Sequence, residues 1–67
     1  MNVKELAVNT MQQVVAEIAK TTNNIDNYLA SDAPAKYHRQ DISNLLGGMK
    51  TRVAKIILDN AGLTAKQ

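Results

Sequence analysis

The sequence predicts an all-α fold, an antiparallel two-helix hairpin that is completed by self-association into a four-helix bundle or by a partner protein. Two long segments each carry apolar residues at alternating spacings of three and four, the period of an amphipathic helix. The short stretch LASDAP separates them, so the two helices should fold back on each other. The chain has only 67 residues and no cysteine, so association with another chain is the remaining way to reinforce so small a fold.

We place the first helix at residues 3–30. The polar run TTNN at 21–24 lowers the helix propensity, but the apolar stripe stays in phase through it, so we expect one continuous helix with a softer second half. Thr22 is the one member of the stripe that is not plainly apolar. The stripe consists of Val8, Met11, Val15, Ile18, Thr22, Ile25 and Leu29.

A turn is predicted at about 31–32, with the second helix at 33–61. Ser31 and Asp32 are both favourable residues for capping the start of a helix. Pro34 fits a first helical turn, because the N–H group that it lacks has no partner there. The second helix should therefore begin directly after the turn and run beside the first.

The end of the second helix is predicted from Gly62, which we place just past the last helical residue in the left-handed conformation. Residues 63–67 should then form a frayed tail. The whole chain, residues 1–67, is one domain. The apolar residues of the second helix are Ile42, Leu45, Leu46, Met49, Val53, Ile56 and Ile57.

Two adjacent glycines, Gly47 and Gly48, interrupt this second helix in the stretch LLGGMK. Each costs ~1 kcal/mol in a helix interior. Three interpretations compete: the helix stops and a third one begins, the helix continues and the glycines let another backbone approach closely, or they are a tolerated weak point. Because the apolar stripe stays in step across the pair, we predict a continuous helix with a bend at this site.

The apolar stripes are wider than a seam between two helices needs. Adjacent residues such as Val14 and Val15 are both apolar, and the same holds at 45–46 and 56–57. A single partner helix would leave these doubled positions partly exposed to water. This excess of apolar surface predicts a protein partner, a homodimer, or both. The residues expected in protein contacts are Val8, Met11, Val15, Ile18, Ile25, Leu29, Leu46, Gly47, Gly48, Met49, Val53, Ile56 and Ile57.

No catalytic constellation is visible, and we predict a protein that is not an enzyme. His38 and Asp41 stand three residues apart, but nothing supplies a third metal ligand, and a structural histidine near a helix start is the commoner case. The acidic residues are scattered, and neither serine lies in a nucleophile-like context. We therefore expect no metal, no cofactor and no small-molecule substrate.

The net charge of +2 is too weak to indicate a nucleic-acid or anionic-membrane partner. Lys50, Arg52 and Lys55 make one face mildly basic, but stacking aromatics are missing, so nucleic-acid contact is disfavoured. No apolar run approaches the ~20 residues of a membrane span. Glu5 and Asn9 lie where a signal peptide would be apolar, so we expect a cytoplasmic protein.

The stretch SDAPAKYHRQ at 31–40 resembles the turn of the small type III secretion needle co-chaperones. In that family an Asp- and Pro- or Gly-containing turn is followed shortly by a Tyr, and here Asp32, Pro34 and Tyr37 occupy those places. An aliphatic-rich second helix follows, as RVAKIIL at 52–58 does here. The resemblance covers about half of the chain, and the needle subunits themselves are a nearby alternative.

The resemblance implies a helical hairpin that binds a second chaperone subunit and keeps an aggregation-prone needle subunit monomeric in the cytosol. Together with the excess apolar surface, it predicts a small chaperone or adaptor that masks the apolar helix surface of a partner. The alternative is a homodimeric four-helix-bundle regulator, of the plasmid or phage type, that contacts RNA or DNA.

Overall fold

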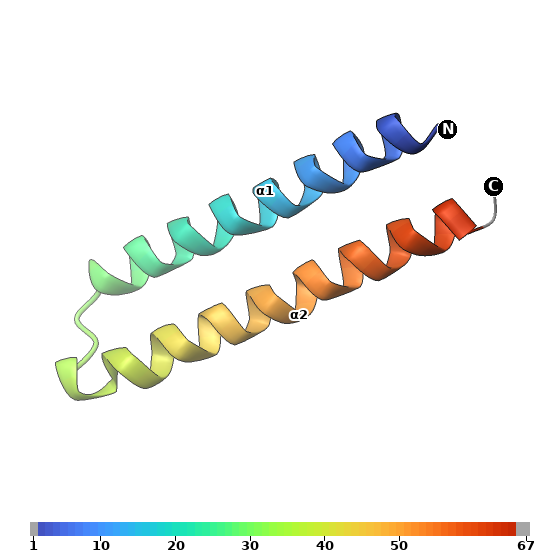
Figure 1. Cartoon of the computed structure of the whole chain (residues 1–67). Coiled ribbons are helices and arrows are strands. Elements are labelled where there is room, and N and C mark those ends of the chain that lie inside the picture. Colours follow the sequence, from blue (N-terminus) through green and yellow to red (C-terminus); the bar gives the residue numbers. More distant parts are fainter. Residues whose placement is uncertain (1, 66–67) are drawn as a thin grey trace.

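Two long antiparallel helices make up the fold, as the computed structural model of the chain shows (Figure 1). The structure describes residues 2–65, and side chains are described for residues 2–62. Helix α1 spans Val3–Leu29, a 3₁₀ turn η1 spans Ala35–Tyr37, and helix α2 spans His38–Ala65. The predicted all-α helical hairpin is confirmed, and the described residues form no strand.

Helix α1 is closed at both ends by local hydrogen bonds. The Asn2 side chain accepts the backbone N–H of Glu5 at 2.8 Å, which satisfies one of the free donors of the first turn. At the other end, the Ala30 N–H donates to the Asp26 carbonyl at 3.0 Å. The hydroxyl and the N–H of Ser31 both donate to the Tyr28 carbonyl. Ser31 thus closes the first helix, whereas the sequence had suggested that it opens the second.

Helix α2 begins later than predicted, at His38 rather than near 33. Pro34 has extended backbone angles, φ −61° and ψ 136°, and its carbonyl accepts the Tyr37 N–H at 3.0 Å to form η1. A proline also disfavours the helical conformation in the residue before it, here Ala33. The His38 ring bonds to the Ala33 carbonyl at 2.9 Å, and since a carbonyl only accepts, Nε2 is the donor. His38 therefore has a structural role in the turn.

All three glycines lie inside α2. The predicted continuity of the helix through Gly47 and Gly48 is confirmed. The prediction that Gly62 ends the helix in the left-handed conformation is wrong: no described residue has positive φ. Glycine lowers helix propensity by ~1 kcal/mol but does not forbid the conformation, and no proline follows to stop the chain. Of the predicted tail, residues 63–65 are helical and residues 66–67 lie outside the described residues.

The hairpin is a single layer of two helices with little interior of its own. It measures 50 × 15 × 9 Å along its principal axes, and the first turn of α1 lies beside the end of α2 (Figure 1). Among the described side chains only Leu6, Thr21 and Asn60 are buried, and Leu6 is the one apolar residue of the three. Most of the apolar surface therefore remains exposed, as described below.

Candidate protein-interaction surface

The seam between the helices is built from one side of α1. The side chains of α1 that α2 covers most recur every three or four residues, and several of them are polar. Thr21 is the most deeply buried, at 2% exposure. The seam residues of α1 are Leu6, Thr10, Val14, Glu17, Thr21, Ile25 and Tyr28.

A polar network holds the middle of this seam together. The Arg52 Nε of α2 donates to the Glu17 Oε2 of α1 at 2.8 Å, and its Nη2 donates to the Thr21 hydroxyl at 3.3 Å. The buried threonine is thereby hydrogen-bonded, as a polar group out of water requires. A Cβ atom at Gly48 would lie only 3.1 Å from Arg52 Nη1, so this glycine leaves room for the guanidinium.

A second polar contact ties the helices together near the turn. The Tyr28 hydroxyl donates to the Asp41 carboxylate, and the Tyr28 ring packs edge-on against the His38 ring with centroids 5.4 Å apart. Desolvation of the phenol, the hydrogen bond to Asp41 and the negative charge of Asp41 together raise the pKa of Tyr28 to about 12. The Tyr28 phenol therefore stays protonated to a higher pH in the folded hairpin than in the unfolded chain.

The raised pKa of Tyr28 predicts a loss of stability at alkaline pH. Because the folded-state pKa of about 12 exceeds the value of 10.0 for a free tyrosine, the contact stabilises fully below pH 10. The stabilisation is lost as the pH rises from 10.0 to about 12. In a Tyr37→Phe chain, which keeps one tyrosine, the phenolate absorbance should titrate with a midpoint that falls when urea unfolds the chain. An Asp41→Asn variant with an unchanged midpoint would contradict this origin of the shift.

The predicted apolar stripe of α1, apart from Ile25, does not face α2. Met11, Val15, Ile18 and Leu29 each directly follow a seam residue, and one residue is a rotation of roughly 100° around an α-helix. These four side chains are accordingly between 45% and 60% exposed. The structure places the more polar side of α1 against α2 and leaves the apolar stripe open.

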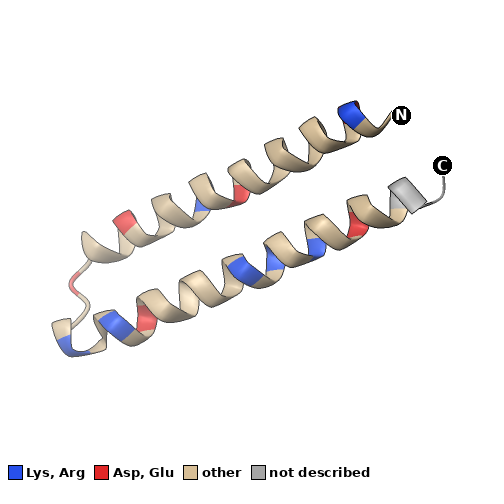
Figure 2. Ribbon diagram, in the orientation of Figure 1, with Lys and Arg blue, Asp and Glu red and all other residues tan. Residues whose placement is uncertain are grey.

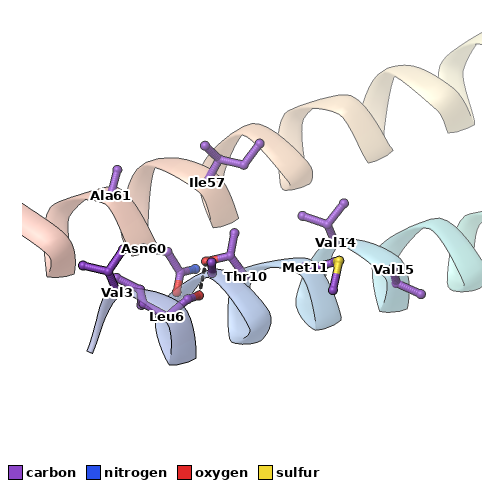
Figure 3. A pocket seen from close by; sticks show the side chains of 10 residues that line it. Val3, Leu6, Thr10, Met11, Val14, Val15, Ile57, Asn60 and Ala61 are labelled. Atoms are coloured by element: carbon purple, nitrogen blue, oxygen red, sulfur yellow. Dashed lines mark hydrogen bonds between the residues drawn. The ribbon is translucent and has the colours of Figure 1, made fainter. Parts of the chain in front are cut away.

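The exposed stripe of α1 and exposed residues of α2 share one face of the hairpin. An open groove of about 470 Å³ runs between the helices near their free ends (Figure 3). Met11 and Val15 line it from α1, and Ile57 lines it from α2. Leu46 lies eleven residues, or about three turns, before Ile57 and so belongs to the same side of α2. We call this surface the apolar face; its exposed large residues are Met11, Val15, Ile18, Leu29, Leu46 and Ile57.

The remaining residues predicted in protein contacts fall into two groups. Ile25, Met49, Val53, Ile56 and Gly48 are half-buried. Val8, the first member of the apolar stripe, is 42% exposed, and a Cβ atom added at Gly47 would meet nothing within 4 Å. The space that a side chain at Gly47 would occupy is therefore open within one hairpin.

Sequence reasoning missed the polar part of the seam. Thr10, Glu17 and Thr21 repeat with helical spacing, but a search for apolar periodicity passes over them. The available signal was the pairing of opposite charges at similar distances from the turn, Glu17 before it and Arg52 after it.

Charged residues are more frequent on α2 than on α1 (Figure 2). Of the basic residues Lys50, Arg52 and Lys55, Arg52 is paired with Glu17 across the seam, and Asp59 follows on the same helix. Within the part of the chain that the structure describes, no three acidic or histidine side chains are placed to share a metal ion. Neither helix, over its described residues, combines the length and apolar character needed to cross a bilayer.

Family models, curated proteins and solved structures were compared with the chain, and none matches it. The features that bear on function are therefore those of the molecule itself: a hairpin with a polar seam and one long apolar face.

Proposed function

We propose that the chain is a small non-enzymatic adaptor that binds and masks apolar helices of another protein on its apolar face. The observation that carries this proposal is the position of the α1 stripe, which is exposed although α2 is available to cover it. A monomeric soluble protein seldom exposes a long contiguous apolar surface without a binding role.

The shape and chemistry of the apolar face suit a helical client. The groove between the two antiparallel helices suits an amphipathic helix, which docks through apolar residues at spacings of three and four. Met11 contributes an unbranched, flexible side chain, which can pack against apolar surfaces of different shapes. Aliphatic side chains such as Val15 and Ile57 supply the area removed from water.

The resemblance of the turn sequence to needle co-chaperones suggests the client. A type III secretion needle subunit is a helical protein that must stay monomeric in the cytosol, and we propose such a subunit as the partner. Binding would cover the apolar helix surface of the subunit until export, and no catalytic group is required for this role.

Needle polymerisation tests the proposal directly. A purified needle subunit is allowed to polymerise while light scattering is recorded, with and without an equimolar amount of the chain. We expect the wild-type chain to suppress the rise in scattering, because it occupies the apolar surface through which the subunits associate. Ile18→Lys, which puts a charge on the apolar face, should lose the suppression.

The matched control for this experiment is Leu58→Lys. Leu58 is 71% exposed and lines a different groove, on α2 alone, so the same substitution there should leave suppression intact. Polymerisation at the normal rate in the presence of the wild-type chain would show that a needle subunit is not the client. Equal suppression of polymerisation by the two lysine variants would show that the apolar face does not bind the client. Retardation of labelled RNA or DNA in a gel at moderate salt would favour a nucleic-acid role instead.

A further inference from the structure

We propose that in the free protein a second copy of the chain covers the apolar face, giving a two-fold symmetric four-helix bundle. The exposed area of the hairpin supports a second copy. The hairpin exposes 5124 Å², whereas a compact monomer of 7.3 kDa exposes about 4,200 Å². An excess of about 900 Å² is close to the ~800 Å² that each partner contributes to a standard interface.

The area is also large enough for a stable homodimer. Two separate copies expose twice 5124 Å², and a compact body of twice the mass exposes about 6,900 Å². Complete burial of the difference would hide about 3,300 Å², which lies within the 2,000–5,000 Å² of obligate homodimers. A partial overlap of the two faces therefore still reaches the size of a specific interface.

Charge and shape make the apolar face complementary to itself. A two-fold contact sets each patch against its own copy, so a charged patch would oppose like charges. The six exposed residues that define the apolar face are uncharged. Lys50, four residues after Leu46 and seven before Ile57, is a charged neighbour of this face on α2, and its long exposed side chain can reach the rim of the contact. A second copy also has the same 50 Å length, and it supplies the second layer of helices that a single-layer hairpin lacks.

The second copy and a client would occupy the same face. The dimer does not depend on the proposed function, but if both are correct, client binding requires the dimer to dissociate. The rate at which a needle subunit binds should then rise less than in proportion to the chain concentration, because a smaller fraction of the chain is monomeric at higher concentration.

Analytical ultracentrifugation and thermal melting test the dimer without any client. We expect a mass of twice 7.3 kDa for the wild-type chain, and a melting temperature that rises over a roughly 100-fold increase in chain concentration. Met11→Lys and Ile57→Lys, from opposite sides of the groove, should each raise the dissociation constant roughly 100-fold. Leu58→Lys, next to Ile57 but outside the groove, should leave the mass unchanged.

Two results would overturn the dimer. One is a wild-type mass of 7.3 kDa at every concentration, with full helicity by circular dichroism and a concentration-independent melting temperature. The other is a dimer that Leu58→Lys disrupts while Met11→Lys and Ile57→Lys do not. The melting series uses the wild-type chain alone, so it decides the question even if a lysine variant fails to fold. A monomer that still suppresses needle polymerisation would overturn the dimer and leave the proposed function standing.

Discussion

Replacing Leu6 by alanine should lower the free energy of unfolding by about 2–4 kcal/mol, as for other buried leucines. Leu6 is 3% exposed and is the one buried apolar side chain among the described residues. It lies near the free ends of the helices, beside the buried Asn60 (Figure 3). At roughly 0.05–0.15 kcal/mol per residue, a chain of this size has a total stability of about 3–10 kcal/mol, so the loss is a large fraction of it. Urea unfolding followed by circular dichroism at one fixed chain concentration would measure the change.

Leu58→Ala is the matched control for Leu6→Ala. Leu58 is 71% exposed, so the same atoms are removed where they make little contact, and the expected change is within about 0.5 kcal/mol. Similar losses for both variants would show that Leu6 is not the anchor of the seam. A loss at Leu58 alone would mean that the exposed side of α2 is covered in solution, contrary to the arrangement described here.

Replacing Arg52 by methionine should destabilise the hairpin by about 1–2 kcal/mol. Methionine keeps much of the aliphatic stem but removes the hydrogen bonds to Glu17 and to the buried Thr21. The upper limit is modest because the Arg52 side chain is 43% exposed, so water screens part of its interaction with Glu17. A double-mutant cycle with Glu17→Gln would isolate the pair, and a coupling energy of zero would contradict the network.

The two glycines give an independent control on the position of Arg52. Gly47→Ala places its Cβ in open space, so it should gain up to ~1 kcal/mol of helix propensity. Gly48→Ala brings a Cβ within 3.1 Å of Arg52 Nη1 and should gain less. In an Arg52→Met background the difference between the two alanine variants should shrink. An unchanged difference would show that Arg52 does not lie over Gly48.

Local sequence patterns were sufficient for the architecture. The spacing of apolar residues, continuous through TTNN and through Gly47–Gly48, predicted two long helices, and LASDAP predicted the turn between them. The boundaries were less accurate because capping residues are ambiguous: Ser31 closes α1 instead of opening α2, and Gly62 stays helical. In both cases the residue type permits more than one role, and neighbouring contacts select among them.

The sequence by itself determined that this protein is a helical hairpin with more apolar surface than one hairpin seam needs, because both follow from periodicity along each helix. Only the tertiary structure decided which side of α1 faces inward. A rotation of about 100° exchanges the seam for the neighbouring stripe, so helical spacing alone cannot choose between them. The choice depends on pairs distant in sequence, Arg52 with Glu17 and Tyr28 with Asp41, which form with the more polar side of α1 turned toward α2.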